Sequence, residues 1–159
     1  MTSCNRIERY LQAHHVPYEI LTHAHSHTSM ATVHSAHIDA ARLAKAVLLE
    51  GEEGLVAAML PADRDIRLEQ LRQEYGPDLH LADAALIGRV FTDCEPGVVP
   101  GLPQAWGVET LWDDTLLAQP DIYLEAGDHE RLIHVSTRHL REVSPQMRHC
   151  QFSGPVVHH

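Results

Sequence analysis

In Arg42-Leu43-Ala44-Lys45-Ala46-Val47-Leu48-Leu49, the end of a helix runs directly into an apolar segment that is typical of a buried strand. Lys45 is the only lysine in the 159-residue chain, and every other basic side chain apart from the histidines is arginine. Burying an isolated ammonium group is costly because the group loses its hydration. Lys45 therefore either extends along the strand edge to water or opens onto a cavity.

The same stretch begins the clearest hairpin of the sequence. Residues 45–50 and 55–60 flank Gly51-Glu52-Glu53-Gly54, a turn bounded by glycines. Helical periodicity and short apolar runs recur on both sides of this hairpin, without strict alternation of strand and helix. That order favours an α+β (mixed α/β) single domain, in which short helices surround a mixed, mostly antiparallel sheet.

The predicted elements follow apolar spacing, caps and breakers. Helices are predicted over residues 2–13, 30–37, 38–43, 68–75, 82–90, 113–118 and 136–140, the first capped by Thr2 or Ser3, and the second packing Met30, Val33, His34 and His37 on one side. Strands outside the hairpin are predicted over residues 18–21, 106–112, 121–125 and 132–135. Residues 1–143 form the predicted domain, and residues 144–159, which lack a pattern, are interpreted as a C-terminal tail.

Composition limits the classes of function. Apolar residues make up 44% of the chain and charged residues 21%, as in ordinary globular proteins. The formal charge of −10 argues against a protein that coats DNA or RNA, although a pocket for the end of a nucleic acid remains compatible with it. No apolar run is long enough to span a membrane, and the first residues do not look like a signal peptide, so we expect a cytoplasmic protein.

In addition to Lys45, two loops are candidates for the functional site. Residues 93–103 contain three prolines and two glycines, which predicts a stiff loop with exposed backbone N–H groups. The turn Gly127-Asp128-His129 follows another predicted strand. All three features lie at strand ends, where side chains and backbone donors can converge on one cleft. Preorganised N–H groups and one cation suit the stabilisation of a developing oxyanion or the binding of a phosphate.

Three stretches resemble the YbaK-type family of free-standing aminoacyl-tRNA deacylases, which is related to the editing insertion domain of bacterial prolyl-tRNA synthetase. They are residues 43–49, residues 93–101 and residues 125–129. The resemblance runs in order from about Tyr18 to Leu140. In one loop the chain departs from the family, because it has Pro100-Gly101-Leu102-Pro103 where many relatives carry two prolines followed closely by a glycine.

The resemblance implies hydrolysis of an amino acid wrongly esterified to the 3′ adenosine of tRNA. It implies catalytic or oxyanion-binding roles for Lys45, Gly97, Pro100 and Gly101, and substrate contacts for His27, Thr28, Ser29, Asp128 and His129. His129 also fits a hydrogen-bonding turn residue, and Asp128 a turn cap. The implied partners are the acceptor end of aminoacyl-tRNA and an aminoacyl-tRNA synthetase. An activated ester needs a placed water and oxyanion donors, so no cofactor is expected.

Two other classes of function stay open. The first is a non-catalytic module of the same fold that binds an aminoacyl group, a nucleotide or a protein. The second is a metal-dependent hydrolase, in which imidazoles from His23, His25, His27, His34 and His37 would hold zinc or nickel. That cluster has no HExxH motif and no carboxylate at ligand spacing, so no metal is predicted. Cys94 is interpreted as a small half-buried thiol rather than a nucleophile.

Overall fold

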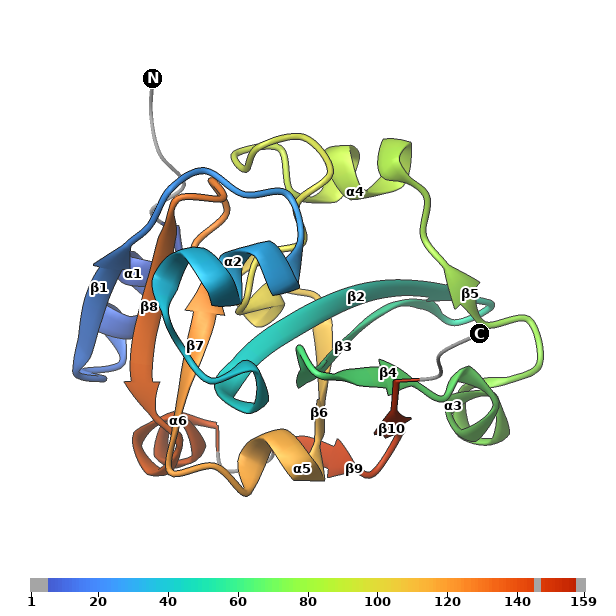
Figure 1. Ribbon diagram of the computed structural model, residues 1–159. Coiled ribbons are helices and arrows are strands. Elements are labelled where there is room, and N and C mark those ends of the chain that lie inside the picture. The colour runs from blue at the N-terminus through green and yellow to red at the C-terminus, as the bar shows by residue number, and fades with distance from the viewer. Residues whose placement is uncertain (1–5, 145–146, 157–159) are drawn as a thin grey trace.

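The hairpin predicted around Gly51 and Gly54 forms the centre of the fold. The computed structural model describes residues 6–144 and 147–156, and within them a mixed sheet has the strand order β1-β8-β7-β2-β3-β6-β9, with β5 also paired to β2 (Figure 1). A separate two-stranded sheet consists of β4 and β10. The predicted α+β class with a mostly antiparallel sheet is confirmed.

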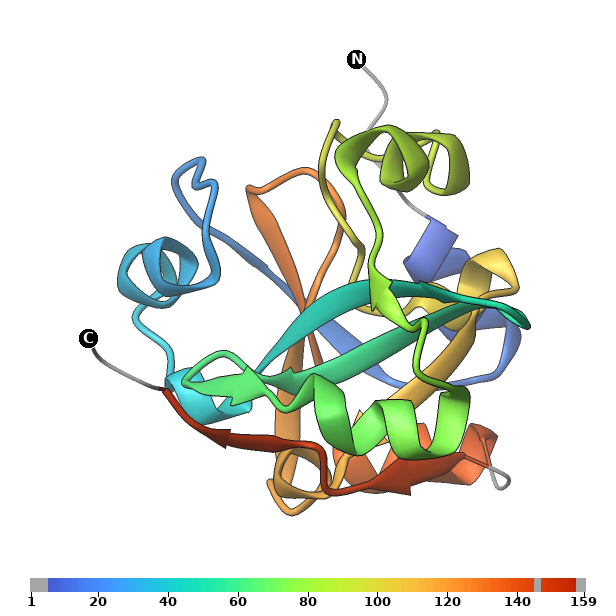
Figure 2. The same ribbon diagram turned by 90° about the vertical axis from the view of Figure 1, so that its right-hand side faces the viewer.

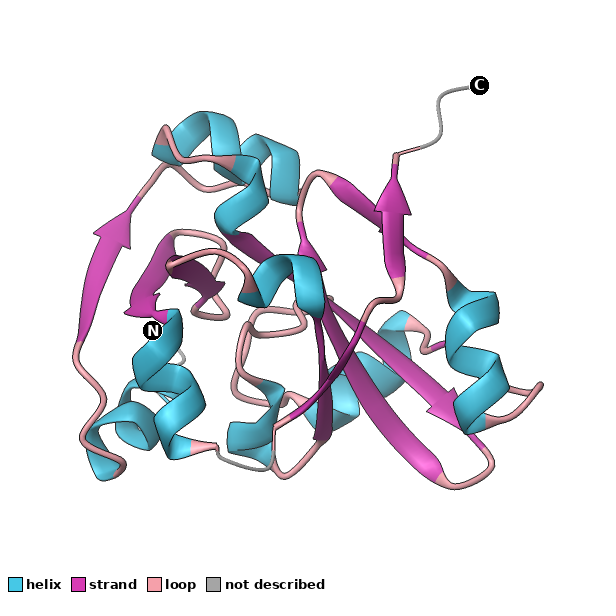
Figure 3. Ribbon diagram, turned by 90° about the horizontal axis from the view of Figure 1, so that it is seen from below, coloured by secondary structure: helices cyan, strands magenta, loops and turns pink. Residues whose placement is uncertain are grey.

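The bounds of the elements match most of the predictions. The strands are β1 (Tyr18–Thr22), β2 (Leu43–Gly51), β3 (Gly54–Pro61), β4 (Arg64–Ile66), β5 (His80–Leu81), β6 (Glu109–Asp113), β7 (Asp121–Glu125), β8 (Arg131–Ser136), β9 (Arg148–Cys150) and β10 (Ser153–Pro155). The α-helices are α1 (Arg6–Ala13), α2 (Ser29–Ala36), α3 (Leu68–Tyr75), α4 (Ala84–Val90), α5 (Asp114–Leu117) and α6 (Thr137–Val143), with 3₁₀ turns at η1 (Ala40–Arg42) and η2 (Pro103–Trp106). Seen from below, the helices lie around the strands (Figure 3).

Side-chain caps explain where several helices begin. The hydroxyl of Thr28 accepts a hydrogen bond from the amide of Ala31 at 3.0 Å and starts α2. The Asp83 carboxylate does the same for α4, where it accepts from the amide of Leu86 at 2.8 Å. Both are N-cap interactions that satisfy amides without an intrahelical partner. None of the described helices has the length and apolarity needed to cross a membrane.

The strand β2 has an incomplete outer edge. The parallel strand β7 pairs with it only at Leu43 and Ala44, and β5 pairs with it only at Leu49 and Glu50. Between these pairings, the carbonyl of Leu48 accepts a hydrogen bond from the amide of Ala82, which is outside any strand. Because backbone groups alternate along a strand, the N–H and C=O of Ala46 point toward the same gap. The sheet therefore leaves a short opening beside Lys45, although β2 is a strand of its interior.

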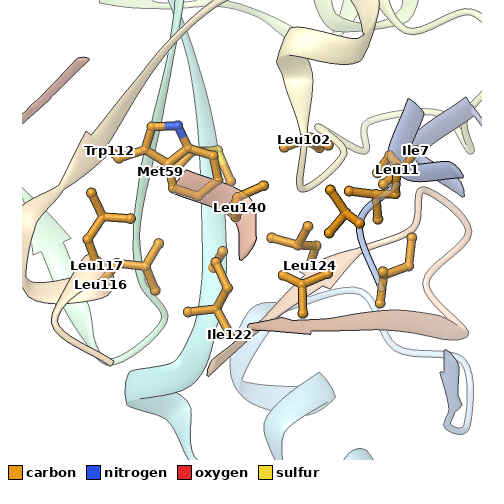
Figure 4. Packing of buried hydrophobic residues seen from close by; sticks show 14 of the residues in the cluster. Ile7, Leu11, Met59, Leu102, Trp112, Leu116, Leu117, Ile122, Leu124 and Leu140 are labelled. Atoms are coloured by element: carbon orange, nitrogen blue, oxygen red, sulfur yellow. The ribbon is translucent and has the colours of Figure 1, made fainter. Parts of the chain in front are cut away.

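The largest buried cluster lies where the sheet meets α1, α5 and α6 (Figure 4). Figure 4 shows Trp112 beside Met59, with Leu124 between that pair and the side chains of α1. Leu102 and Leu124 are both fully buried in this cluster. Leu102 is the sequence neighbour of Gly101 in the loop after α4, and Leu124 is the neighbour of Glu125 at the end of β7. The core thus fixes the loop after α4 and the end of β7 relative to each other.

The prediction of a patternless C-terminal tail is wrong for the described residues. The strand β9 pairs in parallel with β6, and β10 pairs with β4 (Figure 2). Between them, the Phe152 side chain is fully buried among residues of β2, β3 and α3. Strands of three residues are too short to show a period of two, so the sequence pattern alone did not reveal them.

Other predictions differ in detail. The strand predicted over residues 106–112 begins only at Glu109, because residues 103–106 form the 3₁₀ turn η2. The strand β8 is not the last one, and β4 and β5 were not predicted. In α2 the buried side chain is Thr32, whereas Met30 is exposed. The predicted caps Thr2 and Ser3 and the terminal pair His158-His159 lie outside the described residues.

Candidate functional site

A cavity of about 330 Å³ lies beside the gap in the outer edge of β2. Four segments form its walls: the loop and first turn of α2, the strand β2, the region around α4 with its following loop, and the end of β7 with its turn. The residues that line it are His27, Thr28, Ser29, Thr32, Leu43, Ala44, Lys45, Ala46, Val47, Leu48, Leu81, Ala82, Ile87, Gly97, Val98, Val99, Glu125 and His129. These segments are far apart in the sequence, so only the fold brings them together.

Lys45 lines this cavity and is half-buried. Its ammonium group donates a hydrogen bond to the carbonyl oxygen of Arg64 at 2.6 Å. Burial lowers the pKa of Lys45, and the nearby carboxylates of Asp65 and Asp63 oppose that change. An ammonium group carries three N–H donors, so two remain for a ligand or water. Of the two positions considered for Lys45, the strand edge and a cavity, the structure shows the cavity.

The C-terminal strand β10 holds the carbonyl to which Lys45 is bound. The Arg64 guanidinium donates from Nε to the Ser153 hydroxyl at 2.8 Å and from Nη2 to the Ser153 carbonyl at 3.1 Å. The Ser153 hydroxyl in turn donates to Oδ2 of Asp113 at 2.8 Å, and Asp113 is fully buried. A chain of hydrogen bonds therefore leads from the core to the lysine. Sequence reasoning missed this support because it treated residues after 143 as a tail.

The loop after α4 contributes Gly97, Val98 and Val99 to the cavity. Gly97 lies at φ +83°, a left-handed conformation that favours glycine, and the residue is exposed. Within the described residues, the amide of Gly97 donates to no acceptor, so it is open to a ligand. Val98 and Val99 form apolar wall beside it.

Pro100 and Gly101 do not line the cavity, which corrects the expectation that they contact the substrate. The Gly101 amide donates to the carbonyl oxygen of Glu125 at 2.8 Å, so it is not available to an oxyanion. A Cβ atom on Gly101 would lie 2.5 Å from the Glu125 amide nitrogen and 2.8 Å from Cα of Leu124. Glycine is therefore required at this position because the loop packs directly against the backbone of β7.

Glu125 is the acidic side chain of the cavity, and sequence reasoning did not identify it as a site residue. Its Oε1 atom accepts hydrogen bonds from the amides of Gly127 at 3.4 Å and His129 at 3.2 Å. Burial raises the pKa of Glu125 to about 7, although these two hydrogen bonds lower it, and the charges of Asp128 and Glu95 raise it further. It is one of 22 acidic residues in the chain, so no compositional signal singles it out.

Three histidines lie close together beside the cavity, and two of them, His27 and His129, line it. The ring of His25 lies 4.7 Å from that of His27 and 5.5 Å from that of His129, measured between centroids, and His27 and His129 are 5.4 Å apart. Nε2 of His25 lies 3.0 Å from Oε1 of Glu95. Burial lowers the pKa of His129; the Glu95 charge opposes this, and the other two rings add to it. The predicted substrate residues His27 and His129 are thus brought together.

Thr28 and Ser29 also line the cavity, as predicted for substrate contacts, but Thr28 already caps α2. Asp128 is different and corrects the prediction. Its Oδ1 atom accepts hydrogen bonds from the amides of Glu130 and Arg131 at 3.0 Å, and its Oδ2 atom from Nε of Arg131 at 2.7 Å. Burial alone would raise the pKa of Asp128, but these hydrogen bonds outweigh it and lower the pKa. Asp128 is a turn cap outside the cavity lining, the alternative role considered for it.

The described residues contain no group of three His, Cys, Asp or Glu side chains placed to hold a metal ion. The metal alternative combined His25 and His27 with His23, His34 and His37. In the cluster that forms, it is His129 that joins His25 and His27. His23 is buried, and its Nδ1 atom lies 2.7 Å from the carbonyl oxygen of Ala24. Cys94 is half-buried and does not line the cavity.

Comparison with known proteins places these observations in context. The family model described as the aminoacyl-tRNA editing domain matches residues 23–143. Among solved structures, the hypothetical protein APE2540 has a TM-score of 0.82 at 18% identity, over 94% of this chain and 99% of that one. A protein described as a "putative trans-editing enzyme for prolyl tRNA synthetase" has a TM-score of 0.80 at 16% identity, over 97% and 98% of the two chains. At these identities the two structures show a shared fold. No curated protein matches the sequence.

Proposed function

Because the chain belongs to the aminoacyl-tRNA editing domain family, we propose that it is a trans-editing hydrolase of mischarged aminoacyl-tRNA. It cleaves the ester between the amino acid and the 3′-terminal adenosine. The observation that carries this proposal is the cavity itself, which combines the only lysine, an open loop amide at Gly97 and an unpaired stretch of strand edge at Ala46. These are donors for an anionic backbone and for a carbonyl oxygen.

The reaction needs little from the protein beyond placement. Water attacks the ester carbonyl carbon, and the carbonyl electron pair moves onto oxygen, where N–H donors stabilise the charge. Collapse of this intermediate expels the ribose oxygen, which takes the proton that the water gives up. The ribose hydroxyl beside the ester activates the water. Lys45 binds the terminal nucleotide or the ester through its charge, and the Gly97 amide binds the carbonyl oxygen.

The size and charge of the protein fit this substrate. A cavity of about 330 Å³ is at the small end of the range for ligand sites, about 300–1,000 Å³, so it suits an aminoacyl group with part of its ribose. Small residues such as alanine, serine, cysteine and threonine are the candidates for removal. With a net charge of −10, the protein holds only the acceptor end and gains further affinity from an aminoacyl-tRNA synthetase. The cytoplasm is where these partners meet.

The test is a panel of mischarged tRNAs, incubated with the protein and with Lys45→Ala in the presence and absence of a chelator. We expect release of one or two small amino acids by the wild type, at least about a hundredfold slower with Lys45→Ala, because a charged hydrogen-bond donor contributes a few kcal/mol. Arg138→Ala removes an exposed positive charge from α6 and serves as the matched control. Release that the chelator abolishes would indicate a metal-dependent hydrolase. No release from any tRNA by the folded wild type would indicate a non-catalytic binding module.

A further inference from the structure

Glu125 lines the cavity, and one of its carboxylate oxygens has no hydrogen-bond partner among the described residues. Both backbone hydrogen bonds, from Gly127 and His129, are to Oε1. Within the described residues Oε2 accepts no hydrogen bond, and it is not among the fully buried atoms that lack one. The side chain therefore turns one carboxylate oxygen to the backbone of its own turn and the other to the cavity. The backbone behind it is fixed, because the amide and Cα of Gly101 pack directly against it.

A carboxylate in this position conflicts with most of what the cavity is proposed to bind. Phosphate oxygens and a developing oxyanion are both repelled by a negative charge, and Glu95 and Asp128 already add negative charge nearby. The ammonium group of Lys45 donates to the carbonyl oxygen of Arg64, and within the described residues no hydrogen bond or ion pair joins it to Glu125. A cation supplied by the ligand resolves the conflict. An aminoacyl ester carries one cation, the α-ammonium group, two bonds from the carbonyl carbon of the ester.

We propose that Glu125 is the receptor for the α-ammonium group of the substrate, through a charge-assisted hydrogen bond to Oε2. This inference rests on the proposed function and names a specificity-determining residue for it. The site distinguishes amino acids from other acyl groups on tRNA, such as α-hydroxy acids and N-blocked amino acids. It also orients the ester, because the ammonium at Glu125 and the carbonyl oxygen at the Gly97 amide fix two points of the acyl group.

The experiment compares two acyl groups that differ only in the α substituent. Wild type and Glu125→Gln are assayed on tRNA charged with alanine and on the same tRNA charged with lactate, in which a hydroxyl replaces the ammonium. Glutamine keeps an oxygen for the two turn amides and removes the charge. For Glu125→Gln we expect kcat/KM on alanyl-tRNA to fall about tenfold to a hundredfold, the size of a lost charge-assisted hydrogen bond, and kcat/KM on lactyl-tRNA to stay within about twofold.

Glu130→Gln is the matched control, since it makes the same change on the same turn at an exposed position outside the cavity. It should leave both substrates unaffected. Equal losses on alanyl-tRNA and lactyl-tRNA with Glu125→Gln would overturn the proposal, because a general base or a purely structural residue affects both. Unchanged kinetics on both substrates would overturn it as well.

A binding measurement separates this inference from the proposed function. The probes are two adenosines with a non-hydrolysable 3′ amide, one carrying an alanyl and the other a lactyl group, titrated calorimetrically into wild type and Glu125→Gln. Preferential binding of the alanyl probe by the wild type, abolished in Glu125→Gln, supports an ammonium receptor even if no tRNA is hydrolysed. Equal affinity of the wild type for both probes would refute it even if hydrolysis is observed.

Discussion

The two strands that border the cavity, β2 and β7, each bring one charged side chain to it, but they support that side chain in different ways. Lys45 is held by the carbonyl of Arg64, which depends on β10 and on the buried carboxylate of Asp113. Glu125 is held by amides two and four residues further along its own turn. The lysine side of the site thus depends on chain segments far apart in sequence, whereas the glutamate side is largely local.

Burial moves both groups toward their neutral forms. Burial lowers the pKa of Lys45 and raises that of Glu125 to about 7, so the charged form of each side chain carries an electrostatic cost. A ligand that brings a negative charge to one wall and a positive charge to the other relieves both. We therefore expect the cavity to prefer a dipolar ligand, and changes on its β2 side and on its β7 side test this expectation.

The largest effect is expected at Gly101, which packs against the backbone of β7. In Gly101→Ala the new Cβ lies within 3 Å of the backbone of Leu124 and Glu125, which cannot move without breaking β7 from the core. We expect the free energy of unfolding to fall by about 3 kcal/mol or more, measured by urea denaturation. Gly97→Ala is the control: it meets open space at φ +83°, so it should cost only about 1 kcal/mol. Equal costs for the two variants would contradict the close packing at Gly101.

The raised pKa of Glu125 predicts that the stability of the protein depends on pH. Because the folded pKa of Glu125 is about 7 and the unfolded value is near 4.5, the folded state keeps a proton that the unfolded state releases. Its contribution to stability is therefore full below pH 4.5 and is lost as the pH rises toward 7. Glutamine does not ionise, so Glu125→Gln does not lose stability in this way as the pH rises. We expect it to be more stable than the wild type at pH 8, by about 2–3 kcal/mol from the size of the shift, and similar at pH 4.5.

The measurement is thermal unfolding of both proteins across this pH range. The groups that share the region of Glu125 are Glu95, Asp128, His129 and Lys45. Burial lowers the pKa of His129, and the residue is present in both proteins, so its contribution cancels in the difference to the extent that it does not interact with Glu125. A difference between the two proteins that stays constant with pH would show that Glu125 is ionised in the folded state throughout.

The smallest effect is expected from Ser153→Ala, which changes the support of Lys45 through Arg64. This change removes the hydroxyl that accepts from Arg64 and donates to Asp113, but it leaves the pairing of β10 with β4. We expect about 1–2 kcal/mol of lost stability and a severalfold rise in KM for aminoacyl-tRNA, with little change in kcat. Ser136→Ala is the comparison, because the Ser136 side chain makes no capping hydrogen bond. A KM unchanged in Ser153→Ala would mean that Lys45 does not depend on the C-terminal strands.

Much of the site could be predicted from residues that are rare or conformationally special. Lys45 is unique in the chain, and the glycines and prolines of residues 93–103 mark a stiff loop wherever they occur. Helix caps at Thr28 and Asp83 and the Gly51–Gly54 turn have local causes, so their positions follow from a few neighbouring residues. The same holds for the mixed α+β class, because it depends on the order of elements.

What the tertiary structure decided depends on pairings between distant segments. Glu125 becomes a cavity residue only because β7 leaves β2 after two residues, and no property of Glu125 itself distinguishes it from other acidic residues. Gly101 was predicted to offer its amide to a ligand, but the core that holds Leu102 and Leu124 makes it pack against β7 instead. The strands β9 and β10 have three residues each, too few for a periodic pattern. They form because they pair with β6 and β4 respectively. Sequence alone thus determined which residues carry unusual chemistry or backbone freedom, whereas only the packing of distant segments decided which of them face the cavity.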